Sequence, residues 1–449
     1  MDSVVNARQT NSHRRLLRRL FIRGRGLSYY GIADWFLLGL FVLPTYFGVR
    51  LGFFDLTALR FFEILLVWCI FKDRKRKKQL FTLIKSCQHN VWVWAYMLVV
   101  LYTNLIHPSI NTIFYWITNG IIVFYCVAYL VVYEYGIDGF LNKLRQFAWI
   151  VSVISPLELV IGRPPFAFLD TLGKSNTNAR FGSVRIMGNC TTTNGFAMYL
   201  MILFPLMCYD WEKRRIDLGK NKWLLLLMGI NIFLTGSRLT VGTFVLGLFL
   251  CFIFQKRKQL AHSIIVFLVA IPIVVFTCFI FKDVEFVRNL LRTFFSAVDE
   301  ILGSSYALYF GANAQTLYNS SYYRELLWQN TILGDWLNPW LGRGGNYNFA
   351  MYIEGYYILS CDNFYVGQYI TYAWPGVITW LLMSGSFLVS AIKQWVRKRN
   401  RLMLTIIVSI VCYFISLWYL DQLQTFPFMI AVFGLIYGAW YLENKRNSV

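Results

Sequence analysis

Residues 320–345 read SSYYRELLWQNTILGDWLNPWLGRGG, and this polar stretch divides the second half of the chain. It carries Arg324, Glu325, Asp335 and Arg343 together with a glycine cluster, whereas long apolar runs lie on both sides of it. An interval of this kind predicts a large loop that connects two groups of membrane helices. The charges of the other loops predict the side of the membrane on which it lies.

The composition of the 449 residues argues against an ordinary soluble domain. Hydrophobic residues make up 57% of the chain and charged residues only 14%, whereas soluble proteins carry roughly a quarter charged residues. The net charge of +21 would suggest nucleic acid in a soluble chain, but the basic residues here lie in short runs between apolar segments. We therefore expect an all-α, polytopic bundle in a membrane.

Apolar runs recur along the chain and predict about twelve transmembrane helices. Basic residues fill a tail at 1–33, and residues 442–449 form a second tail. Spans one to nine occupy 34–281, with an outer loop at 163–193, and spans ten to twelve occupy 363–441. The predicted spans are 34–50, 54–71, 91–106, 111–133, 147–162, 194–211, 223–236, 239–254, 262–281, 363–391, 402–420 and 424–441.

Loop charge predicts the orientation. With the N-terminus inside, 31 of the 43 Lys and Arg residues fall on the inner side, 11 fall outside, and Arg60 lies within a span. The positive-inside rule then predicts that both termini are cytoplasmic and that 282–362 is a large extracytoplasmic loop between spans nine and ten. Apolar residues at helical spacing in 284–301 predict an amphipathic helix at the membrane interface.

Metal ligands are scarce. The nine cysteines form no CxxC pair and no Cys/His cluster, and the chain has only four histidines. The sequence therefore predicts no metal site and no cofactor. Cys190 and Cys361 both fall on the predicted outer side, so a disulfide between them and two free thiols are both open alternatives.

Arginines on the predicted outer side need an explanation, because positive charge is depleted there. A guanidinium group matches phosphate oxygens bidentately and stays charged, so these arginines as a set predict recognition of an anion. At an outer membrane face, the simplest such anion is a lipid-linked phosphate or diphosphate. Solvation or pairing with a nearby carboxylate is the alternative for each one. The candidates are Arg180, Arg185, Arg238, Arg324 and Arg343.

Arg324 is the strongest of these candidates. The stretch 323–333 predicts a helix that places Arg324 and Trp328 on one face. An ion pair with Glu325 or Asp335 is the alternative role for Arg324. Trp328 could stack on a sugar ring, although anchoring at the membrane interface explains it as well.

Glycines flank Arg343. Gly342 and Gly344 could let the backbone expose successive N–H groups as an anion nest beside the guanidinium. An ordinary tight turn explains the same residues equally well.

Two further motifs carry outer arginines. Arg185 stands in VRIMGNCTTTNGFAMYL, where hydroxyls and amides fall at the start of a helix and offer caps and anion contacts. Arg238 stands in LTGSRLTVG, at the predicted outer turn between two short spans. Plain helix capping, or pairing with carbonyls and headgroups, is the alternative.

Asp362 and Asn363 begin span ten at its outer end. Asp362 could act as a general base, because the low-dielectric boundary can raise the pKa of a carboxyl toward a working range. It could equally be an inert helix cap. Asp335 and Glu354 are reserve candidates for the base.

Four of these pieces resemble, in order, the family of O-antigen polymerases and O-antigen ligases. They are RIMGNCTTTNGFA, LTGSR, YYRELLWQNTILGDWLNPWLGRG and DNFYVGQYITYAWPGVITWLL, which together cover about residues 185–385. The resemblance implies glycosyl transfer from an undecaprenyl-diphosphate-linked glycan to a hydroxyl of another glycan. It assigns Arg185 and Arg324 to the diphosphate. Many ligases of the family have a histidine where this chain has Asp362, which leaves the identity of the base open.

The expected activity is that of a metal-independent, inverting polysaccharide polymerase in the bacterial cytoplasmic membrane, acting in capsule or exopolysaccharide synthesis. Its expected partners are the lipid-linked oligosaccharide, membrane lipids and a chain-length regulator. A ligase that moves finished glycan to a lipid or wall acceptor is the second hypothesis. A flippase is the third, and the pair Arg60 and Glu63, one turn apart in a span, is its clearest sequence feature.

Overall fold

The computed structural model describes residues 29–447 apart from residues 53, 176, 181–182, 312–313, 335–336, 354–355, 359–360 and 422. The described chain is mostly helical, as the sequence predicts. The α-helices are α2 (Tyr29–Phe41), α3 (Ala58–Lys72), α4 (Arg74–Ser86), α5 (Asn90–Ile106), α6 (Ile110–Trp116), α7 (Val123–Tyr129), α8 (Gly136–Ile154), α9 (Glu158–Ile161), α10 (Thr193–Met207), α11 (Lys222–Leu234), α12 (Arg238–Ile253), α13 (Arg257–Ile280), α14 (Glu285–Leu302), α15 (Ala314–Thr331), α16 (Phe364–Lys398), α17 (Arg401–Leu417) and α18 (Phe426–Asn447).

Shorter elements connect these helices. Among the described residues, the strands form four antiparallel two-stranded hairpins and no larger sheet. The strands are β1 (Gly48–Arg50), β2 (Asp55–Thr57), β3 (Ala179–Arg180), β4 (Ser183–Val184), β5 (Tyr209–Asp210), β6 (Arg215–Ile216), β7 (Met351–Ile353) and β8 (Tyr356–Ile358). The π-helices are η1 (Ile117–Ile122) and η2 (Leu130–Tyr135), and the 3-10 helices are η3 (Ser155–Leu157), η4 (Pro165–Leu169), η5 (Tyr306–Phe310) and η6 (Leu423–Thr425).

Among the described residues, three helical runs are long and apolar enough to cross a membrane. They are Ile110–Ile161, Phe364–Lys398 and Leu423–Lys445, and five shorter apolar helices accompany them. One face of α5 is apolar and exposed. Val91, Leu98 and Leu105 lie on it, because they repeat every seven residues and are all exposed. An exposed apolar face of this kind is typical of a helix that contacts lipid. These features define a membrane protein, but they do not establish twelve crossings.

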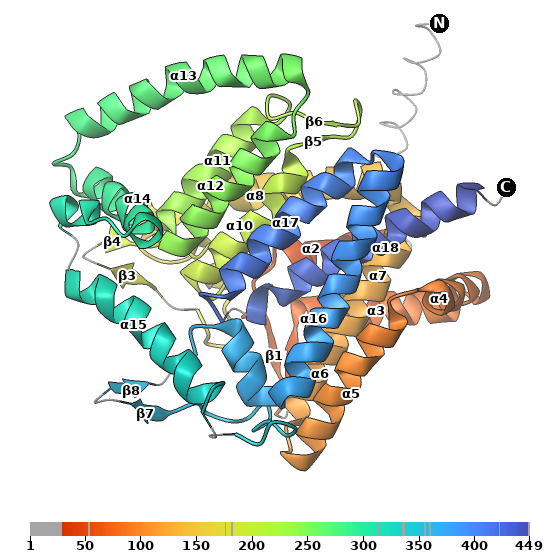
Figure 1. The fold of residues 1–449 in the computed structure, drawn as a ribbon. Coiled ribbons are helices and arrows are strands. Elements are labelled where there is room, and N and C mark those ends of the chain that lie inside the picture. Colours follow the sequence, from red (N-terminus) through yellow and green to blue (C-terminus); the bar gives the residue numbers. More distant parts are fainter. Residues whose placement is uncertain are drawn as a thin grey trace, which may run out of the picture.

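Figure 1 separates several basic connections from α15 and the β7–β8 hairpin. The β5–β6 hairpin and the turn from α16 to α17 lie at the top, and α4 lies at the right. The helix α15 and the β7–β8 hairpin lie at the lower left, beside the start of α16. The helix α13 extends across the top, away from the other helices (Figure 1).

The core of the bundle depends on close helix approach. On α18, Gly434 and Gly438 are four residues apart and face the run from α7 to η2. A Cβ at Gly434 would lie 2.9 Å from the carbonyl oxygen of Phe124, and one at Gly438 would lie 2.8 Å from Cγ1 of Val131. Small residues at this spacing let two membrane helices pack with their backbones nearly in contact.

The long run Ile110–Ile161 differs from the two separate spans predicted at 111–133 and 147–162. Helical structure continues through the expected inner loop, and the direction changes at Gly136, whose φ is +67°. Glycine adopts this backbone conformation without a Cβ clash. The helix α8 therefore begins eleven residues before the predicted span, because its first turns are amphipathic rather than apolar.

The large segment after α13 contains two helices. The amphipathic helix expected in 284–301 is present as α14, and the Asp299 carboxylate near its end accepts hydrogen bonds from Ser304 and from the N–H groups of Tyr306 and Ala307. The helix predicted at 323–333 is present as α15 but begins at Ala314. The polar composition of 314–322 has no apolar periodicity that would have indicated this start.

The helix α16 is broken in its first half. Ala373 has φ 53° and ψ −160°, and Pro375 follows two residues later. Since proline lacks an N–H group and the break removes further helical bonds, backbone groups on both sides lose their usual partners. An alanine with positive φ is strained, so the surrounding structure must hold the break in place.

Residues 339–345, which we call the strap, satisfy these backbone groups. The N–H groups of Arg343 and Gly344 donate to the carbonyl oxygens of Ile370 and Thr371 at 2.8 and 3.0 Å. The N–H group of Trp374 donates to the carbonyl oxygen of Pro339 at 3.1 Å. The strap thereby completes a helix that lacks its own hydrogen bonds, which is how broken helices persist in membrane proteins.

We predict that Gly342→Ala destabilises the protein. A Cβ at Gly342 would lie 2.2 Å from the carbonyl oxygen of Thr371, so the strap would have to move away from α16. Overpacking of this kind costs about 1–3 kcal/mol. A lower thermal unfolding midpoint in detergent would show the effect. Gly385→Ala is the matched control, because a Cβ there meets no atom within 4 Å. Equal midpoints for the two variants would contradict the role given to the strap.

Candidate functional site

Two carboxylates from distant parts of the chain meet at the start of α16. Asp362 lies two residues before that helix, and Asp421 lies in the short connection between α17 and α18. Gly367 permits this approach, because a Cβ there would lie 3.1 Å from Oδ2 of Asp421. Desolvation, and then the charge of Asp362, raises the pKa of Asp421 to about 7. Because the Asp421 side chain is also exposed, it lies in a crevice that is crowded by protein yet open to a ligand.

Asn363 is the cap of α16. Its side-chain oxygen accepts hydrogen bonds from the N–H groups of Tyr365 and Val366 at 2.9 and 3.2 Å. The alternative in which Asp362 caps the helix is therefore wrong. Because Asn363 takes the cap, the Asp362 carboxylate remains on the exposed surface beside Asp421.

The helix α15 brings Arg324 to the same corner. The Arg324 guanidinium lies 5.6 Å from the ring centroid of Tyr419, two residues before Asp421. The neighbouring Tyr323 hydroxyl contacts the backbone of Asp362, and desolvation followed by the charge of Asp362 raises the pKa of Tyr323. One positive and two negative side chains thus surround the start of α16. We call Arg324, Asp362 and Asp421 the acid–arginine corner.

Glu325, one of the expected partners of Arg324, accepts a hydrogen bond from Gln329 at 3.1 Å and is exposed. Trp328 packs inside the protein, with its ring centroid 5.1 Å from that of Trp418. Tyr365 contacts the same Trp418 ring at 5.8 Å. These aromatic contacts fix α15 against α16 and α17, so they hold Arg324 in place.

Gln424 joins the acid–arginine corner to the start of α10. Its side-chain oxygen accepts a hydrogen bond from the N–H group of Thr191 at 3.1 Å, and its amide donates to the Thr192 hydroxyl at 2.6 Å. Thr192 in turn caps α10 by accepting from the N–H group of Gly195. The connection that carries Asp421 is therefore fixed to the RIMGNCTTTNGFA motif.

A cavity of about 370 Å³ lies on the other side of Gln424. Its wall combines apolar side chains with polar ones and includes two cationic side chains, Arg60 and Lys174. Other polar groups on the wall come from Thr45, Asp55, Thr57, Tyr115, Asn119, Asn189, Thr191 and Gln424. A cavity with these walls offers both apolar contacts and hydrogen bonds to a ligand.

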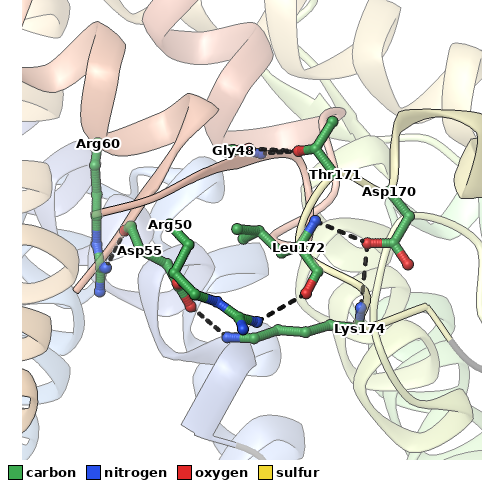
Figure 2. A network of polar contacts seen from close by, with 8 residues as sticks. All are labelled: Gly48, Arg50, Asp55, Arg60, Asp170, Thr171, Leu172 and Lys174. Carbon is green, nitrogen blue, oxygen red and sulfur yellow. Dashed lines mark hydrogen bonds and ion pairs between the residues drawn. The ribbon is translucent and has the colours of Figure 1, made fainter. Parts of the chain in front are cut away.

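Figure 2 shows the ion and hydrogen-bond network at one edge of this cavity. The Asp55 carboxylate binds the Lys174 ammonium at 2.5 Å, and the Asp55 carbonyl oxygen accepts from Arg60 at 2.6 Å. Arg50 donates to the carbonyl oxygen of Leu172 at 3.0 Å. These contacts attach the β1–β2 hairpin to the loop that follows η4.

Arg60 and Glu63 lie one turn apart on α3, and the charge of each acts on the other. The Arg60 guanidinium also donates to the Asp55 carbonyl oxygen. The Glu63 side chain is fully buried, and neither of its oxygens has a hydrogen-bond partner among the described residues. The pair is therefore a charge pair without a hydrogen bond between the two side chains.

A second group contains Arg185 and Arg238. The Arg185 Nε donates to the carbonyl oxygen of Thr235 at 2.7 Å, and Gly236 leaves room for the guanidinium because its own Cβ would lie 2.9 Å from Nε. Arg238 starts α12 directly after this turn and is half-buried. Two sequence motifs that are fifty residues apart are thus in direct contact.

Glu158 positions the segment that carries Arg185. Its carboxylate is fully buried and accepts from the N–H groups of Met187 and Gly188 at 2.8 and 3.1 Å. Gly188 has φ +54° and its Cβ would clash with Phe196, so only glycine fits there. Glu158 therefore fixes the backbone between Arg185 and α10.

The remaining predicted residues have other surroundings. Arg180 lies in β3, opposite Ser183. Arg343 is exposed and lies 5.8 Å from the ring of Tyr347. The N–H groups of Gly344 and its neighbours donate to protein oxygens rather than point outward together, which favours a tight turn over an anion nest at Gly342 and Gly344.

Two predicted residues, Asp335 and Glu354, lie outside the described part of the chain. Cys190 and Cys361 are both buried free thiols, so they do not form the disulfide that the sequence left open. In the part of the chain that the structure describes, no three His, Cys, Asp or Glu side chains gather as metal ligands.

Sequence reasoning missed Asp421 and Gln424. Both lie in LDQLQT, the short polar connection between two apolar runs on the predicted outer side. An acidic residue in an outer connection can indicate a functional carboxylate. This connection is only a few residues long, however, and contains no arginine that would indicate an anion site.

The fold and the acid–arginine corner define a helical membrane protein with ionisable groups gathered at one end of its bundle. Residues 223–381 match the family model of O-antigen ligase, and this match supports assignment of the chain to the O-antigen ligase/polymerase family. The resemblance seen in the motifs is thereby confirmed, and the matched region contains Arg238, Arg324 and Asp362. No curated protein matches the chain. Members of this family are membrane glycosyltransferase-like enzymes that act on lipid-linked oligosaccharides.

We predict that Asp421→Asn stabilises the protein at high pH. The fold holds the pKa of Asp421 near 7, above its ordinary value of about 3.9. The folded protein therefore becomes less stable as pH rises from about 4 through 7, because Asp421 ionises less easily in the folded state than in the unfolded state. Asparagine cannot ionise, so the variant avoids this loss. Thermal unfolding midpoints at pH 4.5 and pH 8 should show a larger gain for the variant at pH 8.

Asp170→Asn is a control of opposite sign. Hydrogen bonds from Ser175 lower the pKa of Asp170 to about 2, so its carboxylate stabilises the fold above about pH 4. This variant should lower the midpoint at pH 8. A gain that is the same at both pH values for Asp421→Asn would contradict the raised pKa.

Proposed function

We propose that this protein is a polysaccharide polymerase that joins undecaprenyl-diphosphate-linked oligosaccharide repeats at the outer face of the cytoplasmic membrane. The observation that carries the proposal is the acid–arginine corner, in which Asp421 has a pKa near 7 and lies beside Asp362, with Arg324 on the adjacent Tyr419 ring. The family match supports the glycosyl-transfer class.

The chemistry needs a base for the acceptor and a positive charge for the leaving group. The acceptor hydroxyl oxygen forms a bond to the anomeric carbon while the bond from that carbon to the lipid diphosphate breaks. Asp421 accepts the hydroxyl proton, since a group with a pKa near the working pH is the most effective general base. The diphosphate leaves with the bonding electron pair and is stabilised by Arg324. A single displacement of this kind inverts the anomeric centre.

Asp362 supports this step through its charge. Its carboxylate raises the pKa of Asp421, so Asp421 holds a proton more readily than an isolated aspartate. In this proposal the cavity lined by Gln424, three residues after Asp421, accommodates a sugar unit, with Arg60 and Lys174 as donors to its hydroxyl groups. We further assign Arg185 and Arg238, which lie together at the turn before α12, to binding of the diphosphate.

Two other activities remain as candidates. A ligase would use the same corner with a lipid or wall acceptor in place of a growing glycan. The aspartate at position 362, where many ligases of the family have histidine, favours the polymerase. A flippase would need ionisable groups along the middle of the bundle. Arg60 and Glu63 are the clearest such pair, but the charge of each acts on the other. The acid–arginine corner gathers its ionisable groups at one end of the bundle instead, which favours an enzyme.

We predict that Arg324→Ala and Asp421→Asn each abolish long polymer in a deletion strain complemented with the variant. Loss of a group that stabilises developing charge slows catalysis by about 10²–10³-fold, and loss of a general base slows it by about 10²–10⁴-fold. Gel analysis of surface glycan, at matched protein levels, measures the chain lengths.

Arg288→Ala is the matched control, because Arg288 is an exposed arginine on α14 in the same large segment. Wild-type chain lengths in both site variants would refute the assignment of the corner. In the null strain, single unpolymerised repeats support the polymerase, whereas unattached long polymer shows a ligase. Synthesis of longer glycan by purified protein in detergent, without a second compartment, excludes a pure flippase.

A further inference from the structure

A second cavity, of about 670 Å³, lies at the opposite end of α16 from Asp362. It is bounded by the start of α5, the second half of α16 and the end of α18. About 20 residues separate the break at Ala373 from Lys393, and at about 1.5 Å per residue they alone match the roughly 30 Å thickness of a bilayer core. This length places the cavity toward the side of the membrane opposite the acid–arginine corner.

The floor of this cavity is made of buried polar side chains. His89, Ser390 and Gln394 are only 3, 4 and 5% exposed. His89 Nδ1 lies 3.0 Å from the Ser386 hydroxyl, and the Gln394 amide donates to the Ser390 hydroxyl at 3.4 Å. Among the described residues, the side-chain oxygen of Gln394 has no hydrogen-bond partner. A buried polar atom without a partner is uncommon, and a bound polar group is one way to supply the missing hydrogen bond.

The rim of the cavity is positively charged. Lys393, Arg397 and Lys398 line it, and Lys398 binds Glu443 at 2.9 Å. Lys393 and Arg397 are exposed and form no ion pair with a described residue. Burial lowers the pKa of His89 to about 4, so the imidazole is neutral and serves as a polar contact. The net charge around the cavity therefore favours an anion.

Apolar side chains continue from the cavity along the outside of α16. Leu381, Leu382 and Val389 line it and are 48, 41 and 47% exposed. Trp92 stands at the mouth on α5 and is also exposed. A polar floor, a cationic rim and an apolar outer wall match the three parts of a phospholipid, which are its headgroup, its phosphate and its acyl chains.

We propose that this cavity binds an anionic phospholipid with a hydroxyl-bearing headgroup, of the phosphatidylglycerol type, from the leaflet opposite the acid–arginine corner. The phosphate lies against Lys393 and Arg397, and the acyl chains lie along Leu381 and Val389. A headgroup hydroxyl reaches Gln394, and because a hydroxyl can both donate and accept, it satisfies the amide in either orientation. A free phosphate ion has no apolar group that could contact the apolar wall. This proposal does not depend on the enzymatic activity.

The first test measures lipid binding by native mass spectrometry on the full-length protein in detergent. Phosphatidylglycerol should bind more tightly than phosphatidylcholine, and excess inorganic phosphate should not displace it. Each basic residue near a membrane surface contributes about 1 kcal/mol to attraction of anionic lipid, so Lys393→Gln with Arg397→Gln should weaken binding by about tenfold or more.

Lys75→Gln with Lys78→Gln is the matched control for loss of charge. Both residues are exposed on α4 and do not line the cavity. Equal loss of binding in the two double variants would reduce the effect to general surface charge and overturn the proposal. Displacement by inorganic phosphate would show a free-anion site, and equal binding of phosphatidylcholine would show a non-selective lipid contact. Either result overturns it as well.

The second test fills the cavity without removing charge. Gly385 lines the cavity, and a Cβ there meets no atom within 4 Å, so Gly385→Leu fits into the open space and removes a helix-weakening glycine. The variant should fold normally and lose phosphatidylglycerol binding by about tenfold, whereas Gly385→Ala should retain it. Unchanged binding in Gly385→Leu would contradict occupation of the cavity by a headgroup.

Discussion

The break at Ala373 is the constraint on which the architecture depends. A membrane helix must satisfy its own backbone groups, and α16 cannot do so where Ala373 leaves the helical conformation and Pro375 lacks an N–H group. The strap donates hydrogen bonds to the carbonyl oxygens of Ile370 and Thr371, which lack their usual partners within the helix. Because the strap lies directly after α15 and its connecting turn, the same hydrogen bonds that complete α16 also fix the segment that carries Arg324.

The position of the acid–arginine corner follows from that attachment. The first turns of α16 carry Asn363 as a cap and Gly367 as the place where Asp421 approaches. On the other side, α15 packs through Trp328 onto Trp418, which places Arg324 beside Tyr419. Three segments that are far apart in the sequence thus meet at one helix end. Desolvation and the charge of Asp362 then raise the pKa of Asp421, because two carboxylates in a crowded crevice do not both ionise easily.

Local patterns allowed much of the helical framework to be predicted. The stripe of apolar residues gave α14, and the threonine run gave a cap for α10 at Thr192, because both are properties of neighbouring residues. The glycine cluster was ambiguous, since a nest and a turn need the same residues, and only the partner oxygens of Ile370 and Thr371 distinguish them. Asp421 could not be placed beside Asp362 from sequence, because their contact depends on how α16, α17 and α18 pack. The start of α15 had no periodic signal.

The strap divides the large segment into parts with different freedom to change during evolution. Substitutions in residues 339–345 must remain compatible with the backbone of α16, so variation there requires matching variation around Ala373. The β7–β8 hairpin follows the strap and pairs only with itself among the described strands. The hairpin can therefore change in sequence without disturbing the hydrogen bonds that complete α16.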